Sequence, residues 1–140
     1  MAILTDVFIS SPAEALRYEE CQAAGQTGAF NEGIQLEGLT NLEFGTLWAI
    51  IDGKEFDFDK HAFESPAPQG ETWLFRFPGA LVQLLATLTP PAIMRVAPLW
   101  AETDEIQWDA AYAEEVLMDL VRLAKLANSS SKGLFFWGSL

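Results

Sequence analysis

The densest group of reactive side chains in this chain lies between residues 55 and 61, in the sequence Glu-Phe-Asp-Phe-Asp-Lys-His. In an extended backbone alternate residues point to the same side, so three carboxylates and the imidazole of His61 would share one face. Carboxylate oxygens and an imidazole can bind a divalent cation or exchange protons. Asp57, Asp59 and His61 are therefore candidate metal-binding or hydrolytic residues.

Two features of this segment argue against such a site. A calcium loop of the EF-hand type that began at Asp57 would need glycine at its sixth position and glutamate at its twelfth, where the chain has Ala62 and Pro68. His61 is the only histidine, and its acidic neighbours favour the charged form, which is a poor general base near neutral pH. The alternative is a solvated loop that its two phenylalanines fasten to the protein, and we expect no metal and no cofactor.

A second acidic segment suits recognition of another protein. Between Trp100 and Trp108 the chain carries Glu102, Asp104 and Glu105. Aromatic anchors surrounded by carboxylates match a surface that presents arginine or lysine. These five residues are the candidate protein-binding site. The alternative is a corner between two helices, in which the tryptophans fill the core.

Composition and charge limit the classes of partner. The chain of 140 residues has 20 acidic and 8 basic residues, a net charge of −12, yet half of it is apolar and five residues are tryptophan. A disordered acidic tail would lack the aromatic residues, and a nucleic-acid-binding protein would be basic. The composition predicts a compact acidic domain with no nucleic-acid partner.

Neither the N-terminus nor the longest uncharged stretch predicts a membrane segment. The longest uncharged stretch, residues 77–94, contains prolines that leave a helix of about 11 residues, or roughly 16 Å, whereas a bilayer core needs about 30 Å. The N-terminus has no basic region before an apolar core, which predicts that there is no signal peptide. Cys21 is the single cysteine, so no internal disulfide can form. We expect a cytoplasmic protein.

The elements that would position these residues alternate along the chain. Helix-capping patterns at Ser11 and Thr40, apolar periodicity and proline positions predict helices and strands. We expect strands at 3–9, 34–37, 71–77 and 134–137, and helices at 12–23, 40–53, 79–88, 91–102 and 109–127. Pro98 should kink or break its helix near Met94, and Leu16 should point inward.

Together these elements predict a single α+β domain over residues 1–140. A small mixed or antiparallel sheet would be covered by about four to five helices. Four consecutive apolar residues at 134–137 favour a strand that is buried on both faces. Trp73, Leu120 and Phe136 carry the clearest apolar patterns of their elements, and we expect them to be buried together.

Three segments resemble a family of small acidic bacterial proteins of unknown function. They are Leu47-Trp-Ala-Ile-Ile-Asp-Gly53, Trp100-Ala-Glu-Thr-Asp-Glu105 and Leu134-Phe-Phe-Trp137. The resemblance covers most of the chain and implies a bacterial, single-domain protein. It implies no activity and no functional residue.

The sequence therefore favours binding over catalysis. We expect a non-enzymatic acidic cytoplasmic protein that binds a basic protein partner, or associates with itself, as an inhibitor or immunity-type antagonist would. The alternative is a metal-binding or hydrolytic domain that uses Asp57, Asp59 and His61. An exposed tryptophan-flanked acidic patch would support the first hypothesis, and convergence of those three residues in a cleft would support the second.

Overall fold

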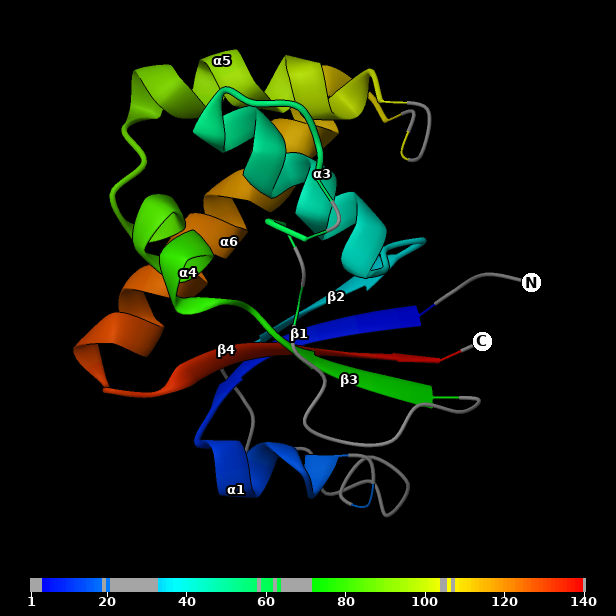
Figure 1. Cartoon of the computed structure of the whole chain (residues 1–140), viewed down its shortest axis with the longest axis vertical. Helices are drawn as coiled ribbons and strands as arrows, with labels where there is room; N and C mark the ends of the chain where they lie inside the picture. Colours follow the sequence, from blue (N-terminus) through cyan, green and yellow to red (C-terminus); the bar gives the residue numbers. More distant parts are fainter. Residues whose placement is uncertain are drawn as a thin grey trace.

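The first and last described strands form the centre of the sheet (Figure 1). The computed structural model describes residues 4–18, 20, 33–57, 59–61, 63, 72–103, 106 and 108–139. The strands in these residues are antiparallel and lie in the order β2-β1-β4-β3. They are β1 (Leu4–Ser10), β2 (Gly33–Glu37), β3 (Thr72–Arg76) and β4 (Gly133–Ser139).

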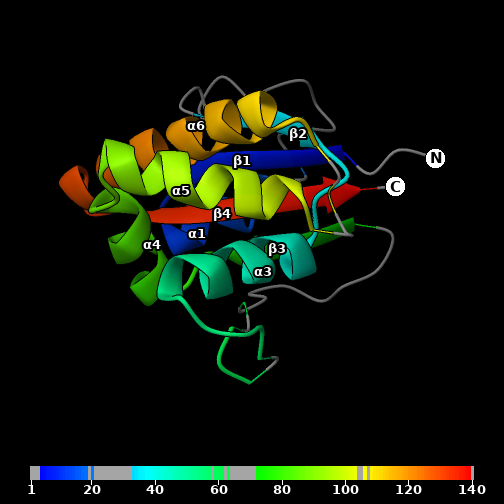
Figure 2. The same cartoon turned by 90° about the horizontal axis from the view of Figure 1, so that it is seen from above.

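Helices cover both faces of this sheet unequally. One face is covered by the longer helices, and among the described residues the labelled helix on the other face is a short one, as Figures 1 and 2 show. The longer helices are α3 (Asn41–Asp52), α4 (Gly79–Ala86), α5 (Pro90–Ala101) and α6 (Ala110–Ser129), and the short one is α1 (Pro12–Ala15). The predicted α+β fold is confirmed, with an antiparallel sheet.

The central strand β4 is buried on both faces, as its four consecutive apolar residues predicted. Leu134 and Phe136 point into the core beneath the longer helices, and Phe135 and Trp137 belong to a second cluster on the side of α1. This second cluster also contains Phe8 from β1, which stacks on Phe135 with ring centroids 5.9 Å apart. Strand β4 lies between β1 and β3, and its side chains therefore contribute to the clusters on both faces of the sheet.

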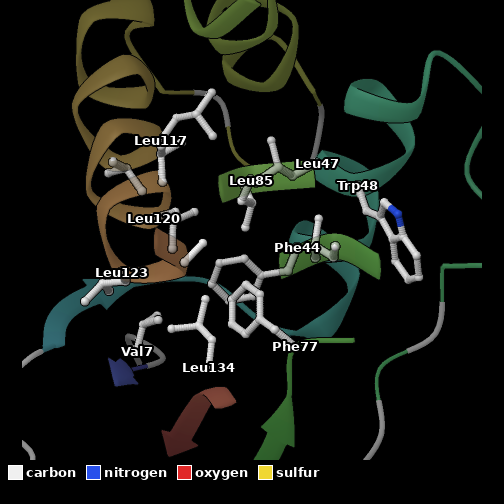
Figure 3. Packing of buried hydrophobic residues seen from close by; sticks show 14 of the residues in the cluster. Val7, Phe44, Leu47, Trp48, Phe77, Leu85, Leu117, Leu120, Leu123 and Leu134 are labelled. Carbon is white, nitrogen blue, oxygen red and sulfur yellow. The ribbon is translucent and has the colours of Figure 1, made fainter. Parts of the chain in front are cut away.

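The main core fills the space between the sheet and helices α3 to α6 (Figure 3). Leu120 and Phe136 are fully buried in it, and Trp73 is half-buried against its edge. Gly138 lies opposite Trp73 across the two strands, and a Cβ atom there would come within 2.2 Å of the indole nitrogen. The glycine therefore leaves the space that this indole occupies.

Local sequence signals set the ends of α3. Thr40 accepts a hydrogen bond from the backbone N–H of Leu42, and Glu43 accepts one from the N–H of Thr40, which is the predicted capping box. At the other end Gly53 has a φ of 71°, a left-handed conformation that glycine adopts without strain. Helix α3 thereby begins and ends close to the predicted residues.

One sequence prediction about a helix is wrong. Leu16 does not point inward, because it is 54% exposed, and Tyr18 is buried in its place. Of the predicted kink or break at Pro98, the break does not occur, since α5 continues from Pro90 to Ala101. Because proline has no N–H, the carbonyl of Met94, four residues earlier, loses its usual helical donor. Cys21, in the predicted continuation of the first helix, lies outside the described residues.

In the described part of the chain, every helix is too short or too polar to cross a bilayer.

Candidate functional site

The segment around Asp57 is a closed turn. The N–H of Asp57 donates to Nδ1 of His61 at 3.0 Å, and the N–H of His61 donates to the carbonyl of Asp57 at 2.8 Å. The carboxylate of Asp57 accepts hydrogen bonds from the N–H groups of Asp59 at 2.8 Å and Lys60 at 3.4 Å. These backbone N–H groups lower the pKa of the Asp57 carboxyl below its ordinary value. The carboxylate of Asp57 is therefore engaged in hydrogen bonds with the backbone of its own turn.

His61 fastens this turn to helix α3. Its ring is 2% exposed, meets the ring of Trp48 edge-on at 5.2 Å and stacks near Phe56 at 5.9 Å. Gly45 makes this packing possible, because a Cβ atom there would lie 2.6 Å from the Phe56 ring. Since Nδ1 accepts a hydrogen bond, the neutral ring carries its hydrogen on Nε2, which is 3.7 Å from a carboxylate oxygen of Asp52. His61 is thus a buried anchor.

The convergence of Asp57, Asp59 and His61 in a cleft, which the alternative metal-binding or hydrolytic hypothesis requires, is not observed. Alternation of side chains requires an extended backbone, whereas residues 57–61 form a turn whose histidine points into the protein. Asp59 remains exposed. Among the described residues no group of three histidine, cysteine, aspartate or glutamate side chains is arranged to hold a metal ion. Phe58 lies outside the described residues.

The Trp100–Trp108 segment begins in the core. Trp100 is fully buried, and its Nε1–H donates to the carbonyl of Glu43 at 3.1 Å, which joins the end of α5 to the beginning of α3. The prediction that Trp100 is an exposed anchor is therefore wrong, because its hydrogen bond and contacts are all internal. Asp104 and Glu105 lie outside the described residues.

The other end of the segment reaches the surface. Trp108 is half-buried and meets Trp100 edge-on at 5.3 Å, and Tyr112 meets Trp108 edge-on at 4.7 Å. The side chain of Tyr112 is 42% exposed. Glu102 is exposed, and its chain neighbour Ala101 accepts a hydrogen bond from the N–H of Trp108 at 3.1 Å, which brings the backbone at Glu102 near Trp108.

Two further exposed acids lie three residues from Tyr112 on either side: Asp109 precedes it at the start of α6, and Glu115 follows it within the helix. We call Glu102, Trp108, Asp109, Tyr112 and Glu115 the aromatic–acidic surface. Sequence analysis missed Tyr112, although a signal was present. Its position falls off the buried stripe of the predicted helix, so the helical period places it toward solvent.

The second half of α6 has the opposite charge. A groove of about 410 Å³ runs between α5 and α6, which lie side by side in Figure 2. Its residues are apolar or basic, namely Ile93, Met118, Val121, Arg122, Lys125 and Leu126. Met118 is 55% exposed and Leu126 is 37% exposed. We call Met118, Arg122, Lys125 and Leu126 the basic half of α6.

A buried polar pair lies on the opposite side of the sheet. The Tyr18 hydroxyl donates to the carboxylate of Asp6 at 2.7 Å, and both side chains are almost fully buried. Burial, followed by the contact with Asp6, raises the pKa of the Tyr18 hydroxyl well above its ordinary value. The ring of Tyr18 stacks on Phe8 at 4.1 Å. A hydroxyl held in its neutral form in this way is suited to fixing α1 on the sheet.

Comparison of the chain with protein-family models, with curated proteins and with solved structures finds no match. The resemblance to small acidic bacterial proteins stays a prediction.

Proposed function

We propose that this chain is a non-enzymatic, cytoplasmic protein-binding domain that uses its aromatic–acidic surface to bind a basic surface of a protein, as an inhibitor or immunity-type antagonist does. The observation that carries the proposal is the exposed ring of Tyr112, which Trp108 holds edge-on at 4.7 Å among exposed carboxylates. Tyrosine and arginine are enriched in binding hot spots, and an aromatic ring attracts a cation placed over its face.

The packing of Tyr112 favours binding because it lowers the entropy cost of association. The ring already rests on Trp108, which rests on the buried Trp100. A side chain that is ordered before a partner arrives loses little freedom on binding. The neighbouring carboxylates supply charge complementary to a basic partner, and the net charge of −12 attracts that partner over longer distances.

Affinity capture with matched charge variants tests this proposal. The test variant replaces Glu102, Asp109 and Glu115 with their amides, and the control replaces Glu14, Glu37 and Glu55, which are exposed elsewhere. Both variants lose three negative charges, so only the location of the loss differs. A third variant, Tyr112→Ala, removes the aromatic ring without changing the charge.

We expect the wild-type chain to capture a basic protein from a bacterial lysate at low salt and to release it as salt rises, because screening shortens from about 10 Å at 0.1 M to about 3 Å at 1 M. Capture should weaken with the test variant and with Tyr112→Ala, and remain with the control. Equal capture by all the variants would mean that the acids only solubilise the protein, and it would overturn the proposal.

A further inference from the structure

We propose that a basic surface recognised by the aromatic–acidic surface is the basic half of α6 in a second copy of this chain. Two α6 helices would pair antiparallel, with Met118 at the centre of the contact. This inference rests on the proposed function, from which it takes the aromatic–acidic surface as one side of the interface. It adds the identity of one partner and the geometry of the complex.

The exposed side of α6 has the spacing that helix pairing requires. Ala111, Glu115, Met118, Arg122 and Lys125 are all exposed, and they follow one another at intervals of four and three residues. Such intervals place side chains on one face of a helix, as in the seam of a coiled coil. The opposite face of α6 is buried in the core, so this helix can present its outer face while remaining fixed.

The charges along this face are self-complementary. Acidic Glu115 precedes Met118, and basic Arg122 and Lys125 follow it. In an antiparallel pair centred between Met118 and Asp119, Glu115 of one copy lies opposite Arg122 of the other, and two-fold symmetry forms this pair twice. A parallel pair would place like charges together. The sequence of charges therefore selects the antiparallel arrangement.

The pairing of Arg122 within its own helix is compatible with this contact. Its guanidinium lies 3.8 Å from Asp119, and both side chains are about half exposed, at 48% and 44%. A guanidinium has five N–H donors, so it can contact carboxylates on two sides at once. Asp119 would hold the arginine at the interface, and Glu115 of the second copy would approach from outside.

The apolar residues give the interface a centre. Met118 is 55% exposed and lies at the groove between α5 and α6, which has a volume of about 410 Å³. Methionine is flexible and fills irregular apolar spaces, so the two Met118 side chains can pack on each other and into the two grooves. In the same register Tyr112 lies opposite Lys125 of the second copy, one residue from Leu126, which is 37% exposed. Both exposed apolar ends would thereby be covered.

The net charge of the protein opposes this association only at long range. Two copies with a charge of −12 each repel one another, but at 0.15 M salt charges separated by more than about 8 Å are largely screened. Pairs in direct contact, such as Glu115 with Arg122, are screened much less. At moderate salt the local charges of α6 therefore decide whether two copies associate.

Sedimentation of the full chain in 0.15 M salt, with charge-reversal variants, tests the proposal. Glu115→Arg would place two arginines opposite each other in the homodimer, and Arg122→Glu would place two glutamates opposite each other. Each should weaken dimerisation by about tenfold or more, because like charges would then meet in the interface. An equimolar mixture should dimerise again, because both contacts then join opposite charges. Glu37→Arg is the control, with the same change in charge on an exposed residue of the edge strand β2.

The outcomes separate this inference from the proposed function. A wild-type chain that stays monomeric at all concentrations, or single variants whose mixture does not dimerise, would overturn the self-pairing. If that chain still captures a foreign basic protein through Tyr112, the proposed function stands alone. Loss in each single variant with recovery in the mixture, and no effect of Glu37→Arg, would establish the antiparallel pair.

Discussion

The turn at residues 57–61 and the outer face of α6 differ in how well the sequence indicates which side chains are exposed. The turn contains the only histidine and alternating carboxylates, yet its histidine is buried and Asp57 accepts backbone hydrogen bonds. The outer face of α6 has no reactive residue that draws attention in the sequence. Nevertheless it presents Tyr112, Met118 and a division of charge to the solvent.

This difference shows that polar side chains supply function only when the fold leaves them available. In the turn, the backbone itself needs hydrogen-bond partners, and Asp57 and His61 supply them. In the helix, each internal N–H and C=O is paired along the backbone, so the side chains of the outer face are left for other contacts. In this protein helix α6 therefore leaves more side chains available for other contacts than the turn does.

The largest expected effect concerns the two faces of α6. Leu120 is fully buried and Met118 is 55% exposed on the same helix. Leu120→Ala should lower the free energy of unfolding by about 2–5 kcal/mol, because it leaves a cavity in the core. Met118→Ala should change it by less than about 0.5 kcal/mol at protein concentrations too low for self-association. Chemical denaturation measures both, and equal midpoints for the two variants would contradict the placement of α6.

The sequence specified the local elements of this fold well. Capping at Thr40, the apolar run at 134–137 and the periodicity of the last helix each report on the backbone within a few residues, and each gave the correct element. The prediction for Leu16 failed because α1 ends at Ala15, so the helical period no longer decides which side chain is buried. Tyr18 is buried because it reaches Asp6, a contact between distant residues.

The candidate sites were harder to predict because they depend on tertiary contacts. Nothing within the sequence around Trp100 shows that its indole donates a hydrogen bond to Glu43, which is 57 residues away. The burial of His61 depends likewise on Gly45 and Trp48 of another helix. Charge and aromatic content drew attention to residues 100–108, whereas the fold shows an exposed ring at Tyr112, outside that segment.

A second, smaller effect should follow from removal of His61. In His61→Ala the ring no longer fills the space beside Trp48, and the N–H of Asp57 loses its acceptor. We expect a loss of roughly 1–3 kcal/mol of stability in urea denaturation, within the usual range for loss of buried contacts. Lys60→Ala, in the same turn but exposed, is the control and should have almost no effect. If both variants are as stable as the wild-type chain, the turn is not an anchor.

A still smaller effect should appear in the pH dependence of stability. The folded-state pKa of Asp57 is below the ordinary value of 3.8, so its charged form stabilises the fold above that pH, and this contribution is lost as the pH falls through the folded-state pKa. Asp57→Asn keeps an acceptor oxygen but does not titrate. Unfolding free energies measured from pH 6 down to the acid limit should therefore fall less steeply in this variant. Identical slopes for variant and wild type would contradict the role of Asp57 in the turn.

The smallest expected effect is that of divalent cations. The donors that looked suited to a metal are turned away from one another, with the carboxylate of Asp57 toward backbone N–H groups and the ring of His61 into the protein. A metal would have to compete with these hydrogen bonds and expose a buried ring before it gained three ligands. Calorimetric titration with Ca²⁺, Mg²⁺, Mn²⁺ and Zn²⁺ should therefore give at most weak heats. A sub-micromolar site that disappears in Asp57→Ala or Asp59→Ala would mean that the turn opens to form a metal centre, and it would make the turn, rather than the outer face of α6, the functional region.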